Sequence, residues 1–198
     1  GGDGGDGGNT YAYGVFGTGN SSHTAIAVDK ISASATAGAA GSGAALGDGV
    51  ATAGDDGVAG EEAKAYGVYA AGGAVIDLSA KNSGPIKINA KAADGSVANE
   101  AYAVYADKGT VLFGSDAELN WDGSSGTDNT LVTGLNNGTL GFSGTSADRT
   151  VTGGKLQLTG SNAFRFTTDL ANNKADSMTF DTIENNGSKQ YIQIGYEE

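Results

Sequence analysis

The chain has 198 residues, including 35 glycines, one proline and no cysteine, and its net charge is −12. Eleven Lys and Arg residues are scattered along it without a cluster, which disfavours nucleic acid and anionic membrane surfaces as partners. Without cysteine it can form neither thiolate metal sites nor a cysteine nucleophile. No segment approaches the roughly 20 apolar residues of a membrane helix, so we expect no membrane insertion.

The chain opens with "GGDGGDGGN", residues 1–9, which has neither the basic start nor the apolar run of a signal peptide. If the protein is exported, we expect its leader to have been removed already. The segment matches most of the nonapeptide of calcium-binding β-rolls, but Gly8 occupies the hydrophobic position and the motif occurs once, whereas a roll needs tandem copies. We therefore expect a flexible glycine loop, with no metal and no cofactor.

Short apolar stretches separated by Gly, Asn, Asp and Ser clusters predict an all-β chain. These stretches are residues 75–78, 86–88, 111–113, 156–158, 164–166 and 192–194. Residues 33–60, rich in glycine and alanine, predict either an outward loop or unstructured filler.

One phrase is repeated: "KAYGVYAAGGAVIDL" begins at Lys64 and "EAYAVYADKGTVLFG" at Glu100, 36 residues later. One coil of a parallel β-helix takes roughly 20 residues, so we interpret this offset as two coils of eighteen, in a solenoid of about ten coils. The interpretation predicts that Val68, Ile86 and Val104 form an inward stack, and that Gly84 lies between Tyr66 and Tyr102. A looser copy near Ala12 lies 53 residues before the first, which is not a multiple of eighteen.

The C-terminal part carries a distinctive order of residues. Residues 164–170 read "FRFTTDL", Asn172 and Asn173 follow, and residues 174–180 read "KADSMTF". A Gly187–Ser188 turn and the strand "YIQI" at 191–194 complete the pattern. This order resembles the end of a passenger domain of the autotransporter (type V secretion) family, with pertactin-like passengers as the closest type. The usual glycine after the second strand is missing in residues 180–183, which leaves that turn undefined.

The resemblance implies a right-handed parallel β-helix, exported across the outer membrane through a β-barrel belonging to the same polypeptide. Residues 1–154 would form the coils, and residues 155–198 a cap that folds first as an autochaperone. The expected hydrophobic cap comprises Phe164, Phe166, Leu170, Met178, Phe180, Tyr191 and Ile194, with Asp169 and Asp176 in its turns. The alternative is that these are ordinary core positions of a last coil.

The expected function is a structural stalk and adhesin or virulence factor at the bacterial cell surface, without catalytic residues. Host glycans or matrix proteins are its expected partners, and an unpaired coil edge would favour self-association. Two alternatives remain: an exoprotein secreted through a separate partner barrel, and a surface glycan lyase or hydrolase using acidic side chains. The acidic candidates for an enzyme are Asp55, Asp56, Glu61, Glu62 and Asp77. The single histidine, His23, lies in "NSSHTAIA" beside no recognisable nucleophile motif.

Overall fold

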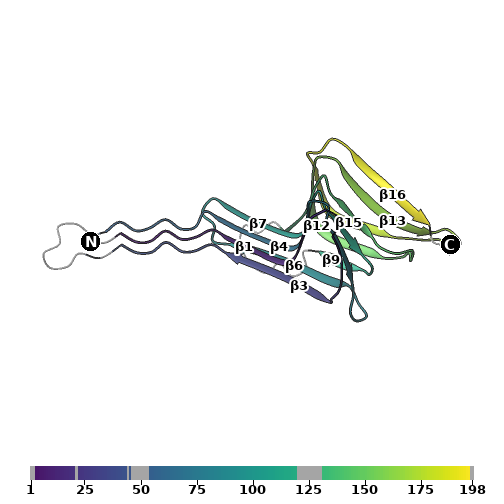
Figure 1. Ribbon diagram of the computed structural model, residues 1–198, viewed down its shortest axis with the longest axis horizontal. Coiled ribbons are helices and arrows are strands. Elements are labelled where there is room, and N and C mark those ends of the chain that lie inside the picture. Colours follow the sequence, from purple (N-terminus) through teal and green to yellow (C-terminus); the bar gives the residue numbers. More distant parts are fainter. Residues whose placement is uncertain (1–2, 21, 44, 46–53, 120–130, 197–198) are drawn as a thin grey trace.

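The computed structural model describes residues 3–20, 22–43, 45, 54–119 and 131–196. Within these ranges every regular element is a β-strand, which confirms the predicted all-β class. The strands form two sheets and pair in parallel, except for the short β13–β14 pair and an isolated bridge between Ala71 and Lys108. Figure 1 shows a body of stacked strands with three extended segments projecting from one end.

The first sheet runs in the order β1, β4, β7, β10, β12, β9, β6, β3, with β15 also paired to β12. Its strands are β1 (Thr10–Thr18), β4 (Glu62–Ala71), β7 (Ala98–Asp107), β10 (Leu131–Asn136), β12 (Thr150–Thr159), β9 (Ala117–Leu119), β6 (Ile86–Ala93), β3 (Lys30–Thr36) and β15 (Ser177–Asn185). The second sheet runs β14, β13, β11, β8, β5, β2, with β16 also paired to β13. Its strands are β14 (Lys174–Ala175), β13 (Asn162–Asp169), β11 (Thr139–Phe142), β8 (Thr110–Phe113), β5 (Val75–Ser79), β2 (His23–Ala27) and β16 (Gln190–Tyr196).

From β1 to β9, each strand pairs with the strand that lies three places later in the chain, so the strands form columns. The strands β1, β4, β7 and β10 form one column, β2, β5, β8 and β11 a second, and β3, β6 and β9 a third. The long strand β12 continues two of these columns, because its start pairs with β9 and its end with β10.

The register contradicts the eighteen-residue coil. Val68 pairs directly with Val104, and Tyr66 with Tyr102, so 36 residues are one step between neighbouring strands and not two. Ile86 pairs instead with Ala117 in the third column, and Gly84 lies outside the strands with φ 129°. The earlier copy fits the same column, since Val15 pairs with Val68. Its longer spacing accommodates the extended segments described below.

The main core is formed mostly by large apolar side chains, which alternate with outward-facing residues along the strands, as expected for one-sided burial. It includes Phe113, Phe142, Ile76, Leu78 and Ile88, all almost completely buried. Val68, Ile86 and Val104 also belong to it, so they are core residues although they do not form one stack.

A second, separate core consists of alanine alone. It lies at the starts of β4 and β7 and at the ends of β3 and β6. Its members are Ala33, Ala35, Ala37, Ala63, Ala65, Ala90, Ala92 and Ala101. Only a methyl side chain remains at these buried positions, which indicates that the facing strands approach closely here. The molecule therefore tapers from its Ile, Leu and Phe core towards the end that bears the extended segments.

The taper ends in three extended segments, residues 3–9, 37–43 and 54–60, which we call the glycine arms (Figure 1). They are joined by backbone hydrogen bonds that recur every third residue. Gly4 N–H donates to Asp55 O, Gly7 to Val58 O, Gly41 to Gly5 O, Gly38 to Gly8 O, Gly57 to Gly41 O and Gly60 to Gly38 O. A period of three is that of polyproline II chains, and collagen likewise places glycine at every third position where chains crowd together.

The flexible loop expected for the first nine residues is therefore wrong for residues 3–9. A Cβ atom on Gly4 or Gly7 would overlap the backbone of Gly41 or Gly38, so glycine is required there for close approach. Of the segment 33–60, residues 33–36 belong to β3, and residues 44 and 46–53 lie outside the described ranges.

Candidate functional site

The repeated phrase builds an aromatic surface on the outer side of the first column. Its three copies, in β1, β4 and β7, each carry two aromatic residues three positions apart. Strict alternation would place such residues on opposite faces. In β4, however, Gly67 and Val68 are both buried, and this extra inward residue leaves Tyr66 and Tyr69 on the same outer face. β7 repeats the pattern with Ala103 and Val104.

The six rings form what we call the aromatic lattice: Tyr13, Phe16, Tyr66, Tyr69, Tyr102 and Tyr105. The rings form two columns of their own across these three strands. In the first, Tyr13, Tyr66 and Tyr102 stack with centroids 5.2 and 5.5 Å apart and planes within 8°. In the other, Phe16, Tyr69 and Tyr105 stack at 5.5 Å with planes within 12°. Rings of opposite columns meet edge to face, as Tyr102 and Tyr105 do at 4.7 Å. Each such pair typically contributes about 0.5–1.5 kcal/mol beyond burial.

The lattice is open at one end and bounded at the other. On β1, the first strand of the column, Tyr13 is 46% exposed and Phe16 is 53% exposed. On β10, Gly134 lies beside Tyr105 in register, and a Cβ atom there would collide with the rings of Tyr105 and Tyr102. The rings of Tyr102 and Tyr105 therefore contact the backbone of Gly134, and the lattice ends at this strand.

Charged side chains line the edge of the lattice. The Lys64 ammonium lies 3.3 Å from the Glu62 carboxylate and 3.5 Å from that of Glu100, and the Tyr11 hydroxyl donates to Glu62. Burial alone would lower the pKa of Lys64, but its carboxylate neighbours, led by Glu100, outweigh that effect and raise it. The hydrogen bond between Tyr11 and Glu62 raises the pKa of Tyr11 and lowers that of Glu62.

The lattice phenols are held in their neutral form. Burial, reinforced by the negative charge of Glu100, raises the pKa of Tyr102 to about 12 and raises that of Tyr66 further. Burial and the negative charge of Asp107 also raise the pKa values of Tyr69 and Tyr105. The lattice is thus an electronegative, half-buried aromatic surface whose hydroxyl groups keep their protons.

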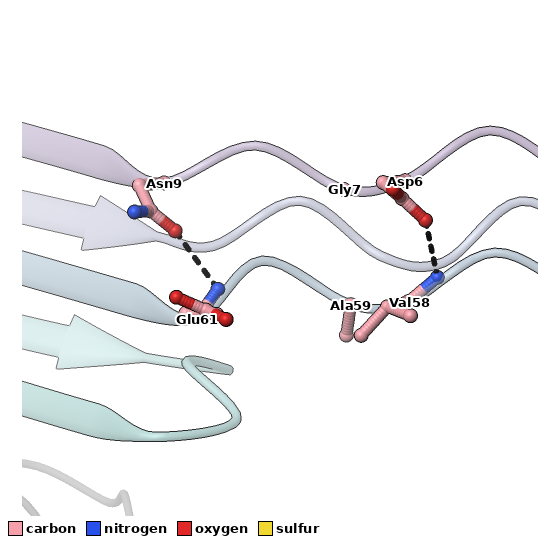
Figure 2. Close-up of a pocket in the computed structure, with 6 residues that line it drawn as sticks. All are labelled: Asp6, Gly7, Asn9, Val58, Ala59 and Glu61. Atoms are coloured by element: carbon pink, nitrogen blue, oxygen red, sulfur yellow. Dashed lines mark hydrogen bonds between the residues drawn. The ribbon is translucent and has the colours of Figure 1, made fainter.

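A second surface lies on the glycine arms, where a shallow hollow is lined by Asp6, Gly7, Asn9, Val58, Ala59 and Glu61. Figure 2 shows the side chains of Asp6 and Asn9 turned towards the arm of residues 54–60. The Asp6 carboxylate accepts a hydrogen bond from Val58 N–H at 2.8 Å, and the Asn9 amide oxygen accepts one from Glu61 N–H at 2.8 Å. Asp3 does the same for Asp55 N–H at 3.0 Å. The Asp, Asp, Asn series of the opening segment therefore ties the arms together.

The acidic residues considered for an enzyme are spread over different parts of the molecule. Asp55, Asp56 and Glu61 belong to the glycine arms or their base, Glu62 borders the aromatic lattice, and Asp77 lies on β5 in the second sheet. Among the described residues, no three His, Asp or Glu side chains gather in a way that could hold a metal ion. The His23 imidazole is mostly exposed, 3.9 Å from Asp77. The part of the chain that the structure describes contains no helix able to span a membrane.

The residues expected to form a hydrophobic cap fall into two groups. Phe164, Phe166, Met178 and Phe180 pack against the main core. Leu170, Tyr191 and Ile194 are 76%, 52% and 53% exposed, so the prediction that they close the end of the core is wrong. Leu170 directly follows β13, and Tyr191 and Ile194 lie on β16, which pairs with β13; none of the described strands covers these side chains.

The two predicted turn residues both accept backbone hydrogen bonds. Asp169 accepts one from Asn172 N–H, and the Asn172 side chain and backbone lower the pKa of Asp169. Asp176 accepts from Arg149 N–H and from Thr167 N–H, at 3.1 and 2.7 Å.

Sequence reasoning missed the partner of Asp176. The Arg149 guanidinium forms a two-point ion pair with Asp176 and donates to the carbonyl oxygens of Phe113 and Ser143, while its Cζ atom lies over the Phe142 ring, 5.0 Å from the centroid. Arg149 is one of only two arginines in the chain, which was the available signal. This buried group, the arginine clamp, connects segments around β8, β11, β12, β13 and β15.

The comparison with known proteins gives no relative: no family model, no curated protein and no solved structure matches the chain.

Proposed function

We propose that this chain is the membrane-proximal part of an exported bacterial surface protein, an autotransporter passenger, folded as a right-handed parallel β-helix. Its role is that of a structural stalk with an adhesive side face. The observation that best supports this proposal is the parallel pairing of every strand from β1 to β9 with the third strand after it. In a parallel β-helix the chain returns to the same side after each turn, one strand spacing further along.

Such an architecture suits a stalk because its length grows with each repeat while its cross-section stays the same. Side chains at equivalent positions then form continuous rows on the outside. The aromatic lattice is such a row, running across β1, β4 and β7. A binding surface of this kind is extended along the stalk, as an adhesin or virulence factor requires.

The proposal includes a folding role for residues 155–198. Each new turn of a β-helix needs an existing strand edge to pair with, so a stable end favours growth from that end during export. The arginine clamp supports this, because it joins β13 and the start of β15 to β8 and β11 through Arg149, Asp176 and Thr167. The outer-membrane barrel of the same polypeptide is the proposed export partner, and a separate partner barrel is the alternative.

The test is surface exposure on the native bacterium. Antibody raised against this chain should label intact cells, and external protease should remove the label without permeabilisation. A label that appears only after permeabilisation would refute the proposal. The size of the membrane-bound species then distinguishes the two routes, because a barrel in the same polypeptide adds its mass to that species.

A further inference from the structure

We infer that the aromatic lattice binds a neutral, extended glycan of the β-1,4-linked type, laid along the two columns of rings. This inference rests on the proposed function, since it names the ligand class of the adhesive side face. It depends on six residues of three adjacent strands, Tyr13, Phe16, Tyr66, Tyr69, Tyr102 and Tyr105. The rings lie on the outer side of the first column, and the two on its edge strand β1, Tyr13 and Phe16, are the most exposed.

The first argument is the orientation of the rings. In each column the planes are nearly parallel, yet the centroids are 5.2–5.5 Å apart. Two rings in full face-to-face contact would be closer, so these rings overlap with an offset, like roof tiles. Each ring then leaves part of its face uncovered by the next ring in its column. The C–H face of a pyranose packs on such a partly exposed aromatic face by the same apolar and electrostatic attraction that aromatic pairs use.

The second argument is the repeat distance. A β-1,4-linked chain in its extended form advances, per sugar, by nearly the same distance as the 5.2–5.5 Å that separates successive rings. One sugar can therefore face each strand, and the match persists along the whole column. Glycans with β-1,3 links curve into helices and do not keep this step. The regular spacing of the lattice favours the extended class.

The third argument is the pattern of polar groups. Five of the six rings carry hydroxyl groups, and Glu62 and Glu100 lie along the edge of the lattice. A sugar presents hydroxyls around its rim, which these phenols and carboxylates can bond while the rings contact its faces. Because the four inner phenols keep their protons, they serve as both donors and acceptors.

Charge selects among extended glycans. The negative charges of Glu100 and Asp107 reach the lattice, where they raise the pKa values of Tyr102 and Tyr105. The nearby positive charge of Lys64 is already paired with Glu62 and Glu100. With a net charge of −12 on the chain, sulfated and uronic-acid glycans are repelled. A neutral glycan is left as the partner that the surface fits.

The experiment is a calorimetric titration of the purified chain with cellohexaose at low and at high salt. Laminarihexaose, which has β-1,3 links, tests the repeat distance, and the cationic chitosan hexamer tests charge. We expect saturable binding of cellohexaose that is unchanged by salt, and no binding of laminarihexaose. Absence of cellohexaose binding, or equal binding of laminarihexaose, would overturn the inference. Binding of the chitosan hexamer alone, abolished by salt, would also overturn it, and would point to a basic protein partner instead.

Variants locate the site. The double change Tyr13→Ala and Phe16→Ala removes the two most exposed rings and should weaken cellohexaose binding about tenfold. Tyr191→Ala is the matched control, because Tyr191 is 52% exposed but lies on β16, outside the lattice. Equal effects of the two changes would refute the placement. Failure of glycan binding by the purified chain, with intact-cell labelling retained, would leave the proposed function standing.

Discussion

Arg149 and Asp176 form a buried, two-point ion pair, with Nη2 2.9 Å and Nε 3.0 Å from the carboxylate oxygens. The remaining capacity of both groups is taken by the protein, because Arg149 also reaches the carbonyls of Phe113 and Ser143 and Asp176 accepts two backbone N–H groups. Complete hydrogen bonding of this kind offsets the desolvation that a buried ion pair incurs. The pair therefore fixes the geometry of the C-terminal strands.

Breaking the arginine clamp should be costly. We predict that Asp176→Ala lowers the free energy of unfolding by about 3–5 kcal/mol, because it leaves the buried guanidinium without its counter-charge. The comparison is Glu184→Ala, which removes an ion pair with Lys155 of 2.7 Å at the surface and should cost at most about 1 kcal/mol. Denaturant unfolding of both variants measures the difference. Similar small losses in the two would show that the clamp does not hold the C-terminal strands.

The glycine arms should distinguish two adjacent glycines. A Cβ atom on Gly7 would overlap the backbone of Gly38 and Gly60, whereas one on Gly8 would meet nothing within 4 Å. We predict that Gly7→Ala separates the arms and exposes the amides of Gly38 and Gly60 to hydrogen exchange. Gly8→Ala should leave their protection unchanged or slightly higher, because it restricts only the unfolded chain. Equal exchange in both variants would contradict the packing of the arms.

The alanine core should reject larger side chains. We predict that Ala65→Leu lowers the free energy of unfolding by about 1–3 kcal/mol, because Ala65 is fully buried among other alanines and leaves no room for the extra carbons. Ala25→Leu, on the exposed face of β2, should change it by no more than about 0.5 kcal/mol. Chemical denaturation gives both values. If Ala65→Leu left the protein as stable as the parent, the strands there would have to be able to move apart.

A buried hydroxyl offers a stabilising change. Thr133 is fully buried between its register partners Val104 and Leu156, and its Oγ1 has no hydrogen-bond partner. Replacing it with the isosteric valine removes an unsatisfied polar group, so we predict that Thr133→Val raises the free energy of unfolding by about 1 kcal/mol. The denaturation midpoint measures this, and a lower midpoint would indicate that the hydroxyl is satisfied in solution.

Stability should decline in alkaline solution through the aromatic lattice. The pKa of Tyr102 rises from its ordinary value of 10.0 to about 12 on folding. An acid with a raised pKa favours the folded, neutral form, so its contribution is complete below about pH 10 and is lost as the pH rises towards about 12. We predict a falling free energy of unfolding across this interval and a smaller fall in Tyr102→Phe. Ultraviolet titration should show late ionisation; ionisation of all eight tyrosines near pH 10 would contradict the burial.

The all-β class followed from the alternating pattern, because inward and outward residues differ in polarity along each strand. The sequence also shows the repeat of the aromatic phrase, but our interpretation of its 36-residue offset as two turns is wrong. A 36-residue offset does not say how many strands lie between its copies. Only the pairing of Val68 with Val104 reveals that three strands, and not six, complete one step.

The aromatic lattice and the glycine arms were harder to anticipate. Tyr66 and Tyr69 share a face because Gly67 adds an inward residue, a local irregularity that strict alternation excludes. The arms depend on contacts between residues far apart, such as Asp6 with Val58, and no local pattern encodes them. The arginine clamp is similar, since its members come from five separate segments.

The period of three in the glycine arms limits how this part of the protein can change in length. Because glycines of each arm must meet the backbone of the other two, an insertion of one or two residues in an arm brings a side chain to a crowded position. Only triplets preserve the pattern, and all three arms must lengthen together to stay paired. The length of the glycine arms should therefore vary among relatives in steps of three residues. The β-stranded body can gain whole repeats independently of the arms.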